Sequence, residues 1–183
     1  MQDNERLILP VELSALTAEQ EAVIATFPSG TRIQEPVGLL LHNPSLAQAI
    51  YPVLNRLRYR SELSDKLREL VTLIASQVWQ QGFEWQVHAP LAADVGLAQD
   101  IIAAISRGDR PFGMDDEEAA VHDFCRSLHA TKFVDNEVYR RTEALLGAAG
   151  ILELCWLSGS YASLAMVMNV AGSPPSWATA TEA

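Results

Sequence analysis

Apolar residues recur every three or four positions along most of the chain, and this helical repeat restricts the possible folds more than any other feature. In one segment, for example, Leu67, Leu70, Val71, Ile74 and Val78 fall on one face of a helix. No segment shows the alternation of apolar and polar residues that is typical of a half-buried β-strand. The sequence therefore predicts an all-α protein.

Capping residues, prolines and glycines indicate where the expected helices begin and end. Thr17 with Gln20, and Asp115 with Glu118, have the spacing of a capping box. The expected helices run from Thr17 to about Phe27, Asn43 to Leu57, Ser64 to about Gly82, Phe83 to Val95, Leu97 to Arg107, Asp115 to about Ala130, Asp135 to Leu146 and Ile151 to Val170.

The last of these segments is long and apolar enough to span a bilayer. Glu153, Asn169 and the cluster Ser158-Gly159-Ser160 interrupt its apolar character, however, and such groups are costly inside a membrane. We therefore expect a buried central helix rather than a membrane span.

The helical pattern covers residues 1–172, which fits one domain of ordinary size. We expect an amino-terminal helical section at residues 1–60 and a core that carries the main motif at residues 61–172. Residues 173–183 contain two prolines and mostly small side chains, with little apolar surface to bury. We predict that this last segment is a mobile tail.

The chain is acidic, with 23 acidic and 13 basic residues and a formal net charge of -10. This balance leaves no basic surface for nucleic-acid phosphates or anionic lipids. The first residues include Asp3 and Glu5 instead of a basic segment followed by an apolar stretch, so no secretory signal is expected. We predict a cytoplasmic protein without nucleic-acid or membrane partners, in which Cys125 and Cys155 are reduced residues of the core.

Two carboxylates and a histidine lie in an otherwise apolar region, where ionisable groups are costly to bury unpaired. Glu84 and His88 are four residues apart, so they share a face if the segment after Gly82 is helical. Glu69 lies on the preceding helix and reaches the same place if the two helices pack antiparallel. A neighbouring carboxylate raises the pKa of a histidine and orients its ring, which suits proton transfer near neutral pH. The three residues are therefore either a proton relay or a structural network that ties two helices together.

A metal site is the less favoured interpretation of Glu84 and His88, although their spacing suits two ligands on one helix. A third ligand is not evident and the HExxH signature is absent, so we expect no metal. His122 and His129, seven residues apart on an acidic helix, are expected at the surface or in an interface.

Several motifs occur in a fixed order along the chain. The central ones are Leu67-Arg68-Glu69-Leu70, then Phe83-Glu84-Trp85 with His88, Pro90, Ala92 and Gly96-Leu97, preceded by Pro36-Val37-Gly38-Leu39-Leu40 and His42-Asn43-Pro44, and followed by Gly147, Gly150, Glu153-Leu154, Gly159, Tyr161 and Asn169. This ordered set resembles the carboxymuconolactone decarboxylase family within the alkylhydroperoxidase-D-like superfamily. The resemblance implies an all-helical bundle that assembles into homo-oligomers, with the site near subunit contacts.

Peroxidase members of this superfamily carry a Cys-x-x-Cys pair between the glutamate and the histidine of the motif. The corresponding residues here are Gln81 and Glu84, and neither can form a sulfenic acid or a disulfide. Glu69 and His88 match the proton-relay positions of the family, and Glu84-Trp85 matches the version of the motif that resembles the decarboxylases.

The resemblance therefore implies a decarboxylase that needs no metal or organic cofactor. Such an enzyme binds an anionic substrate, stabilises the oxyanion formed when carbon dioxide leaves, and returns a proton to carbon. In the implied roles, His88 is the acid and is oriented by Glu69 or Glu84. Tyr161 is a candidate oxyanion donor, and Trp85 is a candidate wall of the substrate pocket.

Three interpretations of function remain open. The first is a cofactor-free lyase or isomerase that acts on a small organic acid or lactone. The second is a peroxide-reducing enzyme that uses Cys125 or Cys155, and the third is a non-catalytic helical oligomer. A dimer, trimer or hexamer is expected in each case, because the chain has more apolar helix than a small helical domain needs.

Overall fold

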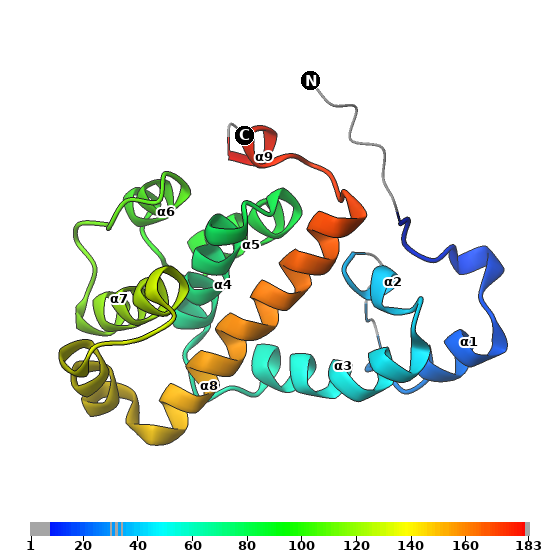
Figure 1. Cartoon of the computed structure of the whole chain (residues 1–183), viewed down its shortest axis with the longest axis horizontal. Coiled ribbons are helices and arrows are strands. Elements are labelled where there is room, and N and C mark those ends of the chain that lie inside the picture. Colours follow the sequence, from blue (N-terminus) through cyan, green and yellow to red (C-terminus); the bar gives the residue numbers. More distant parts are fainter. Residues whose placement is uncertain (1–7, 30, 32, 34, 182–183) are drawn as a thin grey trace.

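Helices account for all the regular secondary structure in the described part of the chain (Figure 1), which confirms the predicted all-α class. The computed structural model describes residues 8–29, 31, 33 and 35–181. Its elements are a 3-10 turn at Leu13–Ala15, α1 (Ala18–Ile24), α2 (Val37–Leu40), α3 (Pro44–Tyr59), α4 (Asp65–Trp79), α5 (Gly82–Asp94), α6 (Gln99–Ser106), α7 (Asp116–Thr131), α8 (Asn136–Ala171) and α9 (Trp177–Thr181).

Both predicted capping boxes are present. The Thr17 side chain accepts a hydrogen bond from the Gln20 backbone N–H at 3.2 Å, and the Gln20 side chain accepts one from the Thr17 backbone N–H at 2.9 Å. Asp115 and Glu118 make the same reciprocal pair at the start of α7, with both distances 2.8 Å. These bonds satisfy backbone donors that have no partner inside the helix, which explains why the two helices begin where the sequence predicts.

Helix α4 lies at the centre of the main core and packs against α5, α6, α7 and α8. Its apolar residues Leu70, Val71, Leu73 and Ile74 are completely buried. Burial of one such side chain is worth roughly 1.5 to 3 kcal/mol. The helix that carries Glu69 is therefore held rigidly on several sides.

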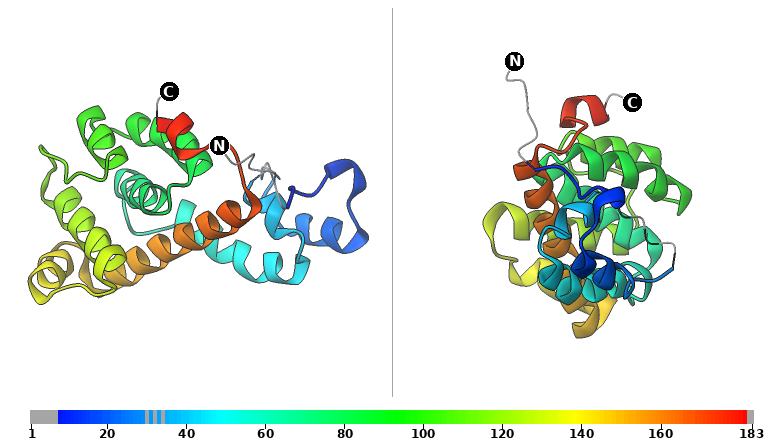
Figure 2. Two further views of the ribbon diagram at one scale, coloured as in Figure 1. Left: turned by 45° about the horizontal axis from the view of Figure 1, so that its top comes forward. Right: turned by 90° about the vertical axis from the view of Figure 1, so that its right-hand side faces the viewer.

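A second, smaller core joins the amino-terminal helices to the far end of α8. In it, Leu39, Leu41 and Ala47 pack with Leu164 and Met168 of α8. Figure 2 shows α1 to α3 gathered at one end of the molecule, beside the last turns of α8. Helix α8 therefore belongs to both cores and fixes α3 relative to α4.

Helix α8 contains a break at Gly147, where we expected two separate helices. Gly147 has φ 66° and ψ 176°, a conformation that residues with a side chain rarely adopt. Helix α8 is also less enclosed than the predicted central helix. Leu154 and Met168 are buried, whereas Leu152 and Trp156 are 60% and 59% exposed on another face.

The segment after Gly172 differs from the predicted mobile tail, because its described part packs against the core. Trp177 of α9 meets Trp85 of α5 edge to face, with the ring centroids 5.1 Å apart. The backbone carbonyl groups of Pro175 and Ser176 lie so close to Gly82 that any Cβ atom at position 82 would collide with them. Trp177 supplies the apolar surface that the sequence analysis overlooked.

Candidate functional site

The turn between α4 and α5 brings the two halves of the predicted relay together. Gln80 adopts the left-handed conformation and ends α4. The Gln81 side chain then caps α5 by accepting a hydrogen bond from the Phe83 backbone N–H at 2.7 Å. Helix α5 packs against α4 as a result, and Glu69 of α4 and His88 of α5 come into direct contact.

Glu69 fixes the tautomer of His88. Nδ1 of His88 lies 2.6 Å from Oε2 of Glu69, and both side chains are only 9% exposed. A carboxylate only accepts hydrogen bonds, so Nδ1 of His88 carries a hydrogen atom and donates a hydrogen bond to Glu69. Nε2 of a neutral His88 is then an acceptor, and no described residue makes a hydrogen bond with it. The relay therefore presents one free, basic ring nitrogen.

Arg58 of α3 is the member of the site that sequence reasoning missed. Its Nη1 atom donates to Oε1 of Glu69 at 3.3 Å and to the Tyr161 hydroxyl at 3.0 Å. The same atom lies 3.5 Å from Nδ1 of His88, but both nitrogens carry protons, so this contact is not a hydrogen bond. Burial opposes the charge of Arg58, yet Tyr161 and Glu69 outweigh it and raise the pKa of the guanidinium. Arg58 is therefore a permanent cation at the relay.

Tyr161 comes from α8 and covers one side of the imidazole. Its ring stands almost perpendicular to that of His88, at 85°, with the centroids 5.2 Å apart. Burial raises the pKa of Tyr161 to about 12, although Arg58 opposes the shift. The phenol therefore stays protonated at neutral pH, and its hydroxyl oxygen accepts the hydrogen bond from Arg58.

Glu84 is buried on the same helix as His88. Burial raises its pKa to about 8, although the positive charge of Arg58 partly opposes the shift. Its Oε2 atom has no hydrogen-bond partner among the described residues. At neutral pH the Glu84 side chain is therefore mostly a neutral carboxylic acid, and its Oε2 atom makes no hydrogen bond with a described residue.

Burial also decides the charge of His88. It lowers the pKa of the imidazole, and the opposing effect of Glu69 does not compensate for it. The sequence led us to expect a raised pKa from the neighbouring carboxylate. That expectation is wrong in its net direction, because it left out the desolvation of a nearly enclosed ring.

Trp85, the predicted wall of the substrate pocket, packs on another side of α5. Trp85 is 5% exposed and its aromatic ring contact is with Trp177, on the side of α5 that α9 covers. Its predicted role as a pocket wall stays a prediction. Among the described residues, no group of three or more His, Cys, Asp or Glu side chains gathers in a way that could hold a metal ion.

The two cysteines lie on α7 and α8, away from the positions that thiols occupy in the peroxidase motif. Burial raises the pKa of Cys125 to about 12 and also raises the pKa of the half-buried Cys155. A thiolate is the form that attacks peroxide, and both environments disfavour it at neutral pH. Cys125 is buried in the core as predicted, whereas Cys155 is half-buried, and the reduced state of both stays a prediction.

Comparison with known protein families supports the resemblance found in the sequence. Residues 44–124 match the sequence model of the carboxymuconolactone decarboxylase family. The matched segment begins with α3 and ends within α7, so it contains Arg58, Glu69, Glu84 and His88. No curated protein matches the chain. Similarity of this segment to the family suggests a decarboxylase or an alkylhydroperoxidase-like activity.

Proposed function

From the family match and the geometry of the relay, we propose that the protein is a cofactor-free decarboxylase or related lyase that acts on a small organic acid or lactone. The observation that carries the proposal is the state of His88. Its Nδ1 atom is committed to Glu69 and is also the ring nitrogen that Arg58 approaches, at 3.5 Å, whereas its Nε2 atom makes no hydrogen bond with a described residue. An oriented imidazole with one free nitrogen is the usual form of a protein acid or base.

Arg58 is the group that would receive the substrate anion. Its side chain is 29% exposed, whereas those of Glu69 and His88 are 9% exposed, so the site is most open on the Arg58 side. A carboxylate that approaches from this side meets a guanidinium already held by Glu69 and Tyr161. Such a charge-assisted contact is stronger than a neutral hydrogen bond.

Binding of the substrate anion would also favour protonation of His88. The free ring is mainly neutral because burial lowers its pKa. A bound anion favours the charged imidazolium, so its arrival raises the pKa and promotes protonation of Nε2. This gives His88 the proton that the reaction needs, and only when the substrate is in place.

The chemical step then requires little from the protein. The carbon–carbon bond to the carboxylate breaks and carbon dioxide leaves. The electron pair moves through a conjugated alkene onto the lactone carbonyl oxygen. Arg58 and Tyr161 stabilise that oxygen, and Nε2 of His88 returns a proton to carbon. Glu84, which is mostly protonated below its pKa of about 8, is a second proton source in the same site.

Two assays on the wild-type protein test this function. We expect carbon dioxide release from unsaturated lactone carboxylic acids such as carboxymuconolactone, without added metal or cofactor. We expect no reduction of an alkyl hydroperoxide by thiol reductants, because neither cysteine favours the thiolate form. Hydroperoxide turnover that disappears in Cys125→Ser or Cys155→Ser protein would replace the lyase proposal with the peroxidase one.

We also propose that the protein self-associates through α8. Leu152, Trp156 and Val170 are 59% to 63% exposed on this helix, and a single chain leaves them facing water. Light scattering at micromolar concentration should give a mass above the 20.0 kDa of one chain. Trp156→Glu should lower that mass, because it places a charge in an apolar contact.

Phe112 offers a matched control for this experiment, since it is 93% exposed but lies in the loop between α6 and α7. Phe112→Glu should leave the mass unchanged. A wild-type protein that runs as a monomer, or equal behaviour of the two variants, would count against an α8 interface.

A further inference from the structure

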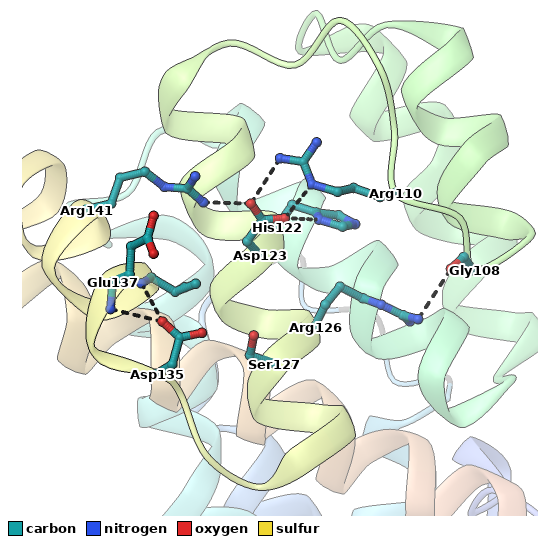
Figure 3. Close-up of a pocket in the computed structure, with 10 residues that line it drawn as sticks. Gly108, Arg110, His122, Asp123, Arg126, Ser127, Asp135, Glu137 and Arg141 are labelled. Carbon is teal, nitrogen blue, oxygen red and sulfur yellow. Dashed lines mark hydrogen bonds and ion pairs between the residues drawn. The ribbon is translucent and has the colours of Figure 1, made fainter.

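A cavity of about 510 Å³ lies between α7 and the start of α8 (Figure 3), and none of the relay residues lines it. Arg110, Arg126 and Arg141 all contribute to its wall. Three arginines around one cavity are notable in a chain with only 13 basic residues and a net charge of -10. Nothing in the proposed decarboxylation uses them.

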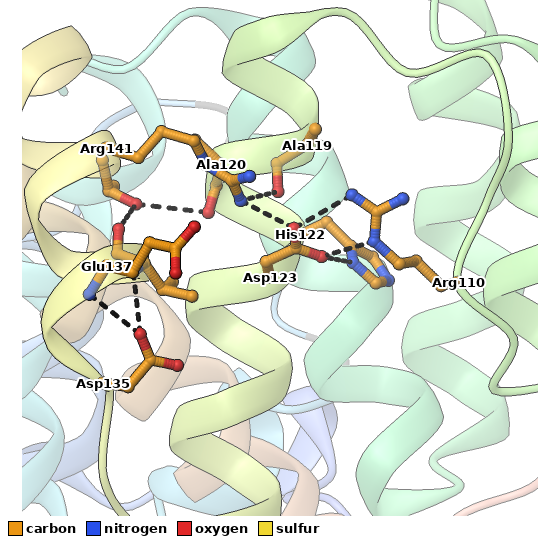
Figure 4. Close-up of polar contacts among 10 residues, drawn as sticks. Arg110, Ala119, Ala120, His122, Asp123, Asp135, Glu137 and Arg141 are labelled. Carbon is orange, nitrogen blue, oxygen red and sulfur yellow. Dashed lines mark hydrogen bonds and ion pairs between the residues drawn. The ribbon is translucent and has the colours of Figure 1, made fainter.

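Asp123 holds two of these arginines in place (Figure 4). Arg110 donates to it through two nitrogens, at 2.8 and 2.9 Å, and Arg141 donates to it at 2.6 Å. His122 lies 3.1 Å from the same carboxylate and is buried, although we expected it at the surface or in an interface. One carboxylate therefore serves two guanidinium groups, so this cluster of three side chains is positive by one charge; the whole lining contains three arginines and three carboxylates.

Arg126 adds a third charge without a countercharge. Its two terminal nitrogens donate to neutral oxygens, namely Oε1 of Gln77 at 2.6 Å and the carbonyl of Gly108 at 3.3 Å. Among the described residues, no carboxylate lies within ion-pair distance of this guanidinium. The Ser127 hydroxyl, on the same wall, also has no described side-chain partner. These donors all border the cavity, with the Arg126 guanidinium extended toward Gly108 and those of Arg110 and Arg141 directed at Asp123 (Figure 3).

Two acidic residues also line the cavity and limit what it can hold. Asp135 is occupied at the start of α8, where it accepts hydrogen bonds from the backbone N–H groups of Glu137 and Val138 at 2.9 and 3.0 Å. The Glu137 side chain makes no ion pair among the described residues and is exposed. Its charge opposes an anion in the cavity and is not needed to hold the arginines.

We propose that this cavity is a binding site for a small organic anion, held through a carboxylate or phosphate group by Arg126 together with Arg110 and Arg141. A guanidinium presents a planar fork of donors that matches both kinds of oxyanion. The Ser127 hydroxyl supplies a further donor. The cavity is much larger than a single oxyanion, and Val138 lines part of it, so the ligand carries an organic portion as well.

We propose to test the site by calorimetric titration of the wild-type protein. Three probes that share a phenyl ring are used. Phenyl phosphate and benzoate carry the two candidate acidic groups, and benzyl alcohol is the neutral control. We expect binding of at least one of the two anions and none of the alcohol. Which anion binds more tightly identifies the phosphate or carboxylate source. Equal binding of all three probes, or no binding up to 10 mM, on the order of the weakest specific affinities, would overturn the proposal.

Two variants test whether the anion binds in this cavity, one that removes a positive charge from its lining and one that removes a negative charge. Arg126→Gln should weaken the favoured anion roughly tenfold or more, as expected for a lost charge-assisted hydrogen bond. Glu137→Gln should tighten it, because it removes a repulsive charge and breaks no described ion pair. Arg107→Gln is the matched control, since Arg107 pairs with Asp109 and does not line the cavity.

The Glu137 variant keeps the test decisive even if Arg126→Gln unfolds through the loss of its contacts to Gln77 and Gly108. Tighter binding in Glu137→Gln protein supports an anion in this cavity. Weaker or unchanged binding in that variant would place the anion elsewhere. Binding that Arg107→Gln reduces as strongly as Arg126→Gln would show a general effect of charge and would also overturn the proposal.

Discussion

Replacement of His88 by glutamine is expected to lower the rate of decarboxylation by about 10²- to 10⁴-fold, the usual contribution of a general acid or base. Glutamine is similar in size and keeps a polar group beside Glu69, but it cannot carry a proton at neutral pH. The fold should survive, because α4 and α5 are held by the apolar core around Leu70 and Ile74. Turnover number and melting temperature are to be measured on the same preparation.

A structural histidine would behave differently from a catalytic one. Loss of its buried hydrogen bond to Glu69 would cost about 1 to 3 kcal/mol of stability and leave the turnover of the folded protein near normal. His129 provides the matched control, because its Nε2 atom bonds to the Ser158 hydroxyl at 2.8 Å outside the relay. His129→Gln should affect stability alone. A destabilised but fully active His88→Gln protein would remove His88 from the mechanism.

The second large effect is expected for Arg58→Met, which should reduce turnover by about 10²- to 10³-fold, as for the loss of one oxyanion donor. Methionine keeps part of the apolar stem and removes the charge. The substrate carboxylate and the developing oxyanion would both lose their cation. The expected loss appears in kcat as well as in KM, because the charge is needed most in the transition state.

The same variant has a titration signature with a defined sign. Arg58 opposes protonation of His88 and lowers the pKa of Glu84, so its removal should raise the pKa of both groups. An NMR titration of the His88 ring would show the upward shift. Arg56→Met is the matched control on α3, since Arg56 pairs with Glu153 at 2.6 Å and takes no part in the relay. Normal turnover in Arg58→Met protein, together with a lost activity in His88→Gln protein, would contradict the substrate role of Arg58.

Sequence spacing was enough to predict the contact between Glu69 and His88, because both residues lie near one turn and the helical repeat gives their faces. It was not enough to find Arg58, which reaches the relay because α3 packs against α8. The sequence did contain a local indication that Arg58 lies near the core. Arg58 follows Leu54 by four residues and Leu57 by one, so it lies beside the apolar face of α3.

The misjudged charge of His88 and the missed packing of α9 have a common cause. The predicted pKa direction considered the nearest carboxylate and left out desolvation, which depends on how many helices surround the ring. The expected mobile tail considered the local composition and left out that Trp177 could meet Trp85 far away in the sequence. In both cases the deciding quantity is the packing of distant segments, which a local pattern does not contain.

The residues of the relay and its neighbours come from four helices, α3, α4, α5 and α8, which affects the order in which their contacts form during folding. The hydrogen bond from Arg58 to Tyr161 joins residues 103 positions apart, whereas Glu69 and His88 are 19 positions apart. Closing the larger loop costs more chain entropy and depends on both α3 and α8 having docked. A partly folded chain can thus form the carboxylate–imidazole pair while its cation and phenol are still missing. Such an intermediate would have helices and an oriented histidine but would lack the oxyanion donors of the proposed decarboxylation, which form only with the last long-range contacts.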